Sequence, residues 1–183
     1  MMPVPRVSVR NSERKPISPR EGMLNSRRTR PLPLLTILVI LPRRPQTFWV
    51  TTWPMLSHGC KIRFADIDAN SLNIDPATVE PLGTKKTKAI YVVHHGGQSV
   101  DMDPIMDIAH RYNLRVVEDC AHAPGATYKG RPVGAIGDIG CFSFHSLKNM
   151  TTGEGGMIVT NDSKLYEYAE PLGTIHMYGE MVE

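Results

Sequence analysis

The most informative stretch of this chain is "CFSFHSLKNMTTGEGGMIVTND", residues 141–162. It places one lysine, Lys148, between an apolar run typical of a strand and a turn rich in threonine and glycine. A second apolar run, 156–161, follows directly after that turn. A lysine that only interacts with solvent could lie almost anywhere in a chain, so this placement calls for a chemical explanation.

Other β-rich runs precede this stretch and alternate with helical patterns. We expect strands at 61–67, 88–94, 114–120, 138–144 and 156–161. We expect helices at 75–82, 101–113 and 163–170, with Asp75 and Asp103 as the N-caps of the first two. Strands this apolar, separated by helices, predict an α/β fold with a mostly parallel sheet flanked by helices.

Polar side chains gather where the expected strands end. Asp119, His122, Ser143 and Lys148 all lie at or just after a strand end, where parallel sheets bind their ligands. A lysine amine and a carboxylate on neighbouring strand ends are what pyridoxal phosphate (PLP) requires: the amine forms a Schiff base, and the carboxylate keeps the pyridine nitrogen protonated. The residues alone leave alternatives open, because Lys148 could be a surface lysine and Ser143 an ordinary strand residue.

Other kinds of site fit the sequence less well. The pair His94 and His95 with Asp101 and Asp103 could suggest a metal site, but neighbouring residues on a strand point to opposite faces, so we expect no metal. The glycine-rich turn lacks the Gly-Lys-Ser/Thr ending of a nucleotide-binding P-loop. The three cysteines are widely spaced, which indicates reduced, mostly buried thiols in a cytoplasmic protein.

A longer stretch carries a specific resemblance. "VVEDCAHAPGATYKGRPVGAIGDIGCFSFHSLKNMTTGEGGMIVTND", residues 116–162, resembles the DegT/DnrJ/StrS family of PLP-dependent nucleotide-sugar aminotransferases. The resemblance extends upstream through "YVVHHGGQSVDMDPIMDIAHRYNL" to "QTFWVTTWPMLSHGCKIRFADIDANSLNIDP", and so covers roughly residues 46 to 178. It implies the large-domain fold of the aspartate aminotransferase type, fold type I of the PLP-dependent transferases.

The resemblance also implies roles for individual residues. Lys148 becomes the Schiff-base lysine, Asp119 the partner of the pyridine nitrogen and Ser143 a phosphate ligand. Phe48 stands where the family places an aromatic ring that stacks on the cofactor. His122 stands where many members have glutamine and others histidine, which implies a cofactor-binding residue that packs against the ring or bonds its hydroxyl. The dehydratases of the family replace the lysine by histidine, so Lys148 favours an aminotransferase.

The implied reaction moves an amino group from glutamate or glutamine to a keto-sugar nucleotide, for the biosynthesis of amino sugars in polysaccharides or antibiotics. Full-length members are homodimers. The alternative hypothesis is a catalytically inactive remnant, or a protein of the same fold that only binds a partner.

The front of the chain differs from the rest. Residues 1–46 hold ten Lys and Arg against two Asp and Glu, and the apolar run 32–41 is too short to span a bilayer. We interpret 1–46 as a disordered or mis-specified leader, in preference to a transit peptide or a nucleic-acid-binding arm, and expect no nucleic-acid or membrane partner. Residues 47–183 are then a partial PLP-binding large domain that lacks one phosphate-binding helix and the small C-terminal domain.

Overall fold

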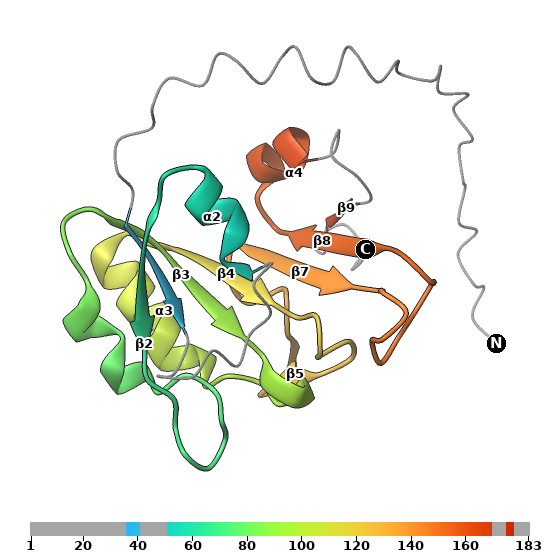
Figure 1. The fold of residues 1–183 in the computed structure, drawn as a ribbon, viewed down its shortest axis with the longest axis horizontal. Coiled ribbons are helices and arrows are strands. Elements are labelled where there is room, and N and C mark those ends of the chain that lie inside the picture. The colour runs from blue at the N-terminus through green and yellow to red at the C-terminus, as the bar shows by residue number, and fades with distance from the viewer. Residues whose placement is uncertain (1–35, 41–50, 170–174, 178–183) are drawn as a thin grey trace. The chain divides into compact units, whose positions relative to one another are not determined.

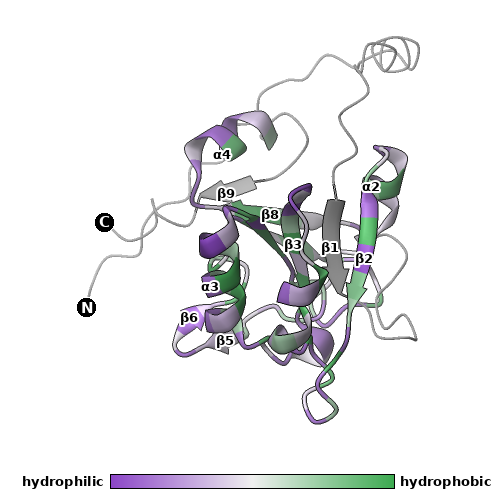
Figure 2. Cartoon of the chain, turned by 90° about the vertical axis from the view of Figure 1, so that its left-hand side faces the viewer, coloured by the Kyte–Doolittle hydropathy of each residue, from purple (hydrophilic) through white to green (hydrophobic). Residues whose placement is uncertain are grey.

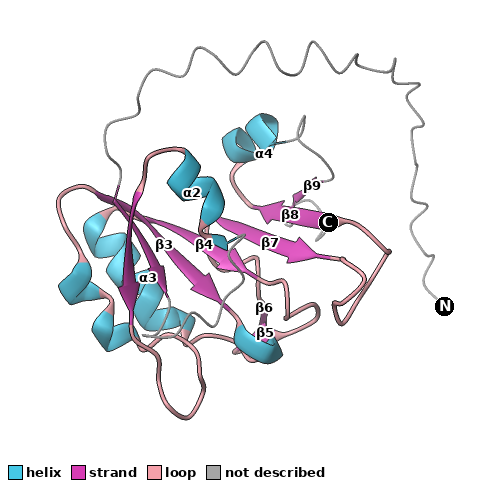
Figure 3. Ribbon diagram, in the orientation of Figure 1, coloured by secondary structure: helices cyan, strands magenta, loops and turns pink. Residues whose placement is uncertain are grey.

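The structure is a computed structural model that describes residues 36–40, 51–169 and 175–177. A mixed sheet of seven strands forms its centre, in the order β2-β1-β3-β4-β7-β8-β9 (Figures 1 and 3). These strands are β1 (Thr36–Ile40), β2 (Lys61–Ala65), β3 (Thr87–Val93), β4 (Arg115–Asp119), β7 (Ile139–Ser143), β8 (Gly156–Thr160) and β9 (Ile175–Met177). Neighbours pair in parallel except β7 and β8, which are antiparallel. The prediction of a mostly parallel sheet is therefore confirmed.

The apolar runs of the sequence correspond to strands. All five predicted strands are present, each with bounds that differ by a few residues from those expected. A further strand, β1, lies between β2 and β3 and comes from the segment that we interpreted as a leader. The leader itself stays a prediction, since residues 1–35 and 41–50 lie outside the described residues.

Two helices cover opposite faces of the sheet. Helix α3 (Met102–Tyr112) contributes Met102, Ile105, Ile108 and Ala109 to a core that also contains Ile90, Val92 and Val116 of the strands. Helix α2 (Trp53–Ser57) packs Met55 against Ile62, Ala89 and Tyr91 on the other face. In Figure 2, α3 and α4 (Ser163–Ala169) carry both hydrophobic and hydrophilic residues, as expected of helices with one face on a sheet. Since adjacent residues of a strand point to opposite faces of the sheet, alternate residues of β3 and β4 face the α3 side and the α2 side.

Two predictions about helices are wrong in detail. Segment 75–82 forms two short 3₁₀ turns, Pro76–Thr78 and Glu80–Leu82, because Pro81 cannot donate a backbone hydrogen bond to extend one helix. Its expected N-cap is confirmed, since the Asp75 side chain accepts a hydrogen bond from the Ala77 N–H. Helix α3, by contrast, has Asp101 as its N-cap. Asp103 lies in its first turn, where its carboxylate binds Lys129 and Arg131 instead.

Short turns complete the fold. His95–Gly97 forms a 3₁₀ turn after β3, and a small two-stranded ribbon joins β5 (Thr127–Tyr128) to β6 (Arg131–Pro132). Among the described residues, no helix is long and apolar enough to cross a membrane.

Candidate active site

The carboxyl ends of β3, β4 and β7 meet at one edge of the sheet. Val93, the last residue of β3, pairs with Asp119, the last residue of β4, and Asp119 pairs in turn with Cys141 of β7. Ser143 lies two residues beyond Cys141 and therefore shares its face of the sheet. The topology thus brings Asp119 and Ser143 to the same edge of the sheet, as the sequence predicted, and also to the same face.

Asp119 is half-buried and bonded on both oxygens. Its Oδ1 accepts a hydrogen bond from the Ala121 N–H at 3.0 Å, which turns the chain at the end of β4. Its Oδ2 accepts one from the Thr51 hydroxyl at 2.9 Å, across 68 residues of sequence. Sequence analysis missed Thr51, although its place three residues after Phe48, in a motif already assigned to the cofactor, was a usable signal.

Half-buried groups near Asp119 respond to its charge. Burial, followed by the charges of Asp119 and Glu118, raises the pKa of the Cys141 thiol to about 11. Burial together with nearby anionic groups, Asp119 among them, raises the pKa of Tyr91 to about 12. Both groups are therefore neutral near pH 7, so that Asp119 acts in a mostly uncharged, partly desolvated setting.

His122 is within electrostatic reach of both the carboxylate and the lysine. Its pKa is lowered, first by burial and then by the positive charge of Lys148, while the charge of Asp119 acts in the opposite direction. The ring of His95 stands edge-on to that of His122, with the centroids 6.2 Å apart. The charges of Lys148 and Asp119 thus both reach His122, and His95, which the sequence places at the same strand end as His94, lies beside it.

The loop that carries Lys148 is closed by its own hydrogen bonds. The Lys148 N–H donates to the His145 carbonyl at 2.9 Å, and the Phe144 carbonyl accepts from the Thr152 N–H at 3.0 Å. At Gly155, where φ is +154°, a Cβ would lie 2.7 Å from the Thr152 hydroxyl oxygen, so a side chain would not fit there. The glycine-rich turn thus lets the chain return to β8 directly after presenting Lys148.

Of the two other predicted cofactor-binding residues, Ser143 is among the described residues and Phe48 is not. The Ser143 hydroxyl accepts a long hydrogen bond, 3.4 Å, from the His145 N–H, which leaves its own hydrogen available to a ligand. Phe48 lies outside the described residues. Its stacking role therefore stays a prediction.

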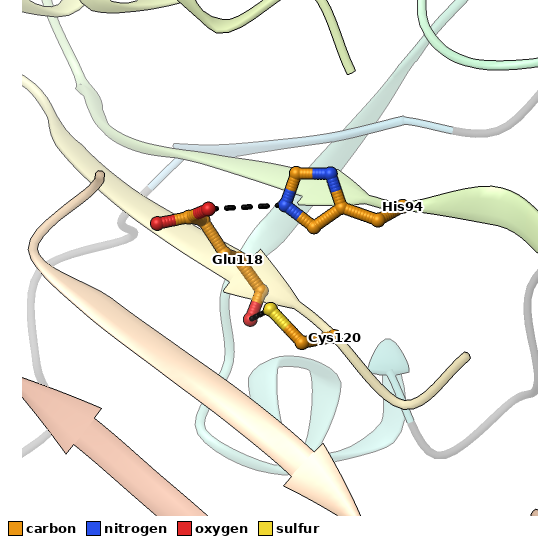
Figure 4. A group of neighbouring side chains, drawn as sticks. All are labelled: His94, Glu118 and Cys120. Atoms are coloured by element: carbon orange, nitrogen blue, oxygen red, sulfur yellow. Dashed lines mark hydrogen bonds and ion pairs between the residues drawn. The ribbon is translucent and has the colours of Figure 1, made fainter. Parts of the chain in front are cut away.

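The residues considered for a metal have other partners. Asp101 binds the Tyr128 hydroxyl, and Asp103 binds Lys129 and Arg131. His94, Glu118 and Cys120 do cluster in the core (Figure 4), but both ring nitrogens of His94 and both oxygens of Glu118 are already hydrogen-bonded. No lone pair of His94 is left to bind a metal ion.

Two cavities lie at the opposite, amino-terminal edge of the sheet, with volumes of about 480 and 390 Å³. They meet at Asn113 and Leu114, between α3 and β4. Neither is lined by a predicted site residue. The predicted site residues that the structure describes therefore lie at the carboxyl edge and not in these two cavities.

Comparison with known proteins accounts for this arrangement. The DegT/DnrJ/EryC1/StrS aminotransferase family matches residues 38–181. The chain belongs to this family. Its fold is fold type I of the PLP-dependent enzymes, as the resemblance in the sequence implied, and the family is PLP-dependent.

Three relatives illustrate the similarity. The chain is 47% identical over 135 residues to the spore coat polysaccharide biosynthesis protein SpsC of Bacillus subtilis, covering 74% of the chain and 34% of that protein. It is 47% identical over 122 residues to the UDP-4-amino-4-deoxy-L-arabinose–oxoglutarate aminotransferase of Shewanella sediminis, covering 66% and 31%. The PLP form of the sugar aminotransferase Spr1654 of Streptococcus pneumoniae, described as putative, superimposes with a TM-score of 0.61 at 32% identity, covering 68% and 34%. The chain thus spans about a third of the length of its DegT-family relatives.

Proposed function

We propose that this chain carries the cofactor-binding core of a PLP-dependent nucleotide-sugar aminotransferase. The observation that supports the proposal best is the position of Asp119 and Ser143 at the carboxyl ends of neighbouring strands in a sheet of this family, with Lys148 on the loop that follows Ser143. A carboxylate, a hydroxyl and an amine at one edge of a sheet are groups that PLP needs. The names of the relatives, which include a nucleotide-sugar aminotransferase, support the substrate class.

Each residue has a distinct task in this proposal. The Lys148 amine would hold the cofactor and could also serve as the base that moves a proton. Asp119 would keep the pyridine nitrogen protonated, and Thr51 and the Ala121 N–H fix the direction of its oxygens. Ser143 would donate a hydrogen bond to the phosphate. When bound, PLP supplies a ring that accepts electrons from the substrate carbon.

His122 is suited to lie against that ring. Its lowered pKa keeps the imidazole neutral near pH 7, so that it adds no positive charge beside the protonated ring nitrogen. His95 packs edge-on against His122 and so restricts the plane of its ring. Phe48 would stack from the segment that precedes Thr51.

The complete reaction involves an amino donor and an acceptor. We propose glutamate or glutamine as donor, and the oxoglutarate in the name of the Shewanella relative fits glutamate. We propose a keto-sugar nucleotide as acceptor, with polysaccharide biosynthesis as the context that SpsC suggests. A homodimer, in the cytoplasm, is the proposed working form of the full-length protein.

The test is a visible absorbance spectrum of the purified chain with PLP, followed by borohydride reduction and mass mapping of the labelled lysine. Lys148→Ala is the control, because it removes the amine and leaves the other lysines in place. A band in the visible region and a label on Lys148, both lost in the control, support the proposal. Labels absent, or scattered over surface lysines, would contradict it and favour the inactive or partner-binding alternative.

A further inference from the structure

The buried carboxylate of Glu118 has a role that the proposed reaction does not explain. Glu118 precedes Asp119 on β4, so its side chain points to the opposite face of the sheet. It is fully buried, as is its partner His94 (Figure 4). Buried carboxylates are rare and costly unless every oxygen is bonded, so this one requires an explanation.

Glu118 accepts four hydrogen bonds. His94 Nε2 donates to Oε2 at 3.0 Å, and Nδ1 of the same ring accepts from the Val100 N–H, which fixes the ring proton on Nε2. The backbone N–H of Gly134 donates to Oε2 at 2.8 Å, and those of Ile136 and Gly137 donate to Oε1 at 2.9 and 2.6 Å. One carboxylate thus binds the end of β3 and the loop that leads into β7.

Both parts of the chain that Glu118 binds, His94 and the loop of Gly134, lie next to the candidate site. The His94 N–H donates to the Asp119 carbonyl at 3.1 Å, and the next residue is His95, whose ring contacts His122. The loop after His94 also lies on the loop of His122, since a Cβ on Gly97 would be 3.1 Å from the His122 carbonyl oxygen. A shift of His94 would therefore move Asp119 and both site histidines.

The loop of Gly134 is equally tight against β7. A Cβ on Gly140 would lie 2.3 Å from the Gly134 carbonyl oxygen, and one on Gly134 would lie 2.7 Å from the ring of Phe142. Phe142 precedes Ser143, the proposed phosphate ligand. Because the backbones touch here, the bonds from Glu118 to this loop also set the position of β7 relative to β4.

We propose that Glu118 is a positioning residue, which holds the three strand ends that carry Asp119, Ser143 and the two site histidines in register from the far face of the sheet. It touches neither cofactor nor substrate, and acts through Asp119 and His94. The expected effect of Glu118 on PLP binding rests on the proposed function. The structural claim, that one carboxylate holds β3, β4 and β7 together, does not depend on a cofactor.

The first experiment compares Glu118→Gln with Glu167→Gln, an exposed carboxylate on α4, in the PLP labelling assay at a temperature where both are folded by circular dichroism. We expect the PLP concentration that half-saturates labelling of Lys148 to rise at least tenfold for Glu118→Gln, and its visible band to shift, since Asp119 no longer faces the ring nitrogen correctly. Glu167→Gln should behave as the parent chain. The proposal would be overturned by a folded Glu118→Gln chain whose half-saturating PLP concentration is within twofold of that of the parent chain.

The second experiment needs neither a variant nor PLP. Native-state hydrogen exchange by NMR measures the opening of single amides in the parent chain. We expect the N–H groups of His94 and Cys120, which make the bonds between strand ends, to open with the same free energy as those of Gly134, Ile136 and Gly137, which bind Glu118. Different opening free energies would overturn the proposal even if Glu118→Gln fails to fold. A parent chain that does not label Lys148 but shows this common opening would contradict only the proposed function.

Discussion

Replacing Glu118 by glutamine should destabilise the fold by several kcal/mol, although the two side chains have nearly the same shape. Glu118 accepts four hydrogen bonds, two at each oxygen, from three buried donors and the half-buried N–H of Gly137. A glutamine offers one carbonyl oxygen, which can keep two of these donors. Its NH₂ group would face the other two, whichever way the amide is turned.

The magnitude follows from the number of donors left without an acceptor. An unsatisfied buried donor costs about 1–3 kcal/mol, so two of them cost about 2–6 kcal/mol. A domain of this kind has a total stability of about 5–15 kcal/mol, so the substitution removes a large part of it. The charge contributes in the same direction. Burial by itself would raise the pKa of Glu118, but the bonds from His94, Gly137 and Gly134 outweigh it and lower the pKa, so the folded state favours the ionised carboxylate.

Urea denaturation followed by circular dichroism measures this loss as a lower midpoint with an unchanged slope. The matched control is Glu167→Gln, an exposed site where we expect a change within about 0.5 kcal/mol. Because the folded pKa of Glu118 is below its unfolded value, its contribution is complete above the unfolded pKa and is lost as the pH falls through the folded pKa. The difference between parent and Glu118→Gln should therefore shrink in acid. A loss below about 1 kcal/mol near pH 7 would refute the four-donor reasoning.

Three further substitutions test the arrangement of the site. Lys148→Met should raise the pKa of His122 in an NMR titration, because it removes a positive charge that lowers this pKa. Asp119→Asn should lower the pKa of His122 further, because it removes a negative charge that raises it. If both substitutions shifted the pKa in the same direction, the two charges would not act on the ring with opposite signs. Since folding lowers that pKa, neutral His122 stabilises the chain fully above about pH 6.5 and loses this contribution as the pH falls through the folded value. Thr51→Val should cost about 1.5 kcal/mol in urea denaturation and Thr51→Ser much less, because only valine removes the donor to Asp119; equal losses would speak against the bond. Gly140→Ala should cost about 3 kcal/mol, because its Cβ would collide with backbone that cannot rotate away, and a neutral result would contradict the close approach.

Features that depend on neighbouring residues could be predicted from the amino-acid sequence. Apolar runs identified the strands, and the threonine- and glycine-rich turn after Lys148 marked the loop that closes on itself in the structure. The family resemblance, carried by an unbroken stretch around Asp119 and Lys148, gave the fold type that the comparisons show. Local patterning, turn chemistry and motif spacing act over a few residues, so they can be recognised without knowing which segments meet in space.

Contacts between segments far apart in the chain became visible only in the folded protein. The bond from Thr51 to Asp119 spans 68 residues, and it exists because the segment before α2 lies on the same face of the sheet as the end of β4. The sequence "VVED" does not reveal which of its two acidic residues is buried. Adjacent residues of a strand point to opposite faces of the sheet, and the environment of each face depends on the neighbouring strands and helices. Glu118 became the buried one because the order of β3, β4 and β7 gave its two oxygens four donors there, and Asp119 was thereby turned toward the site.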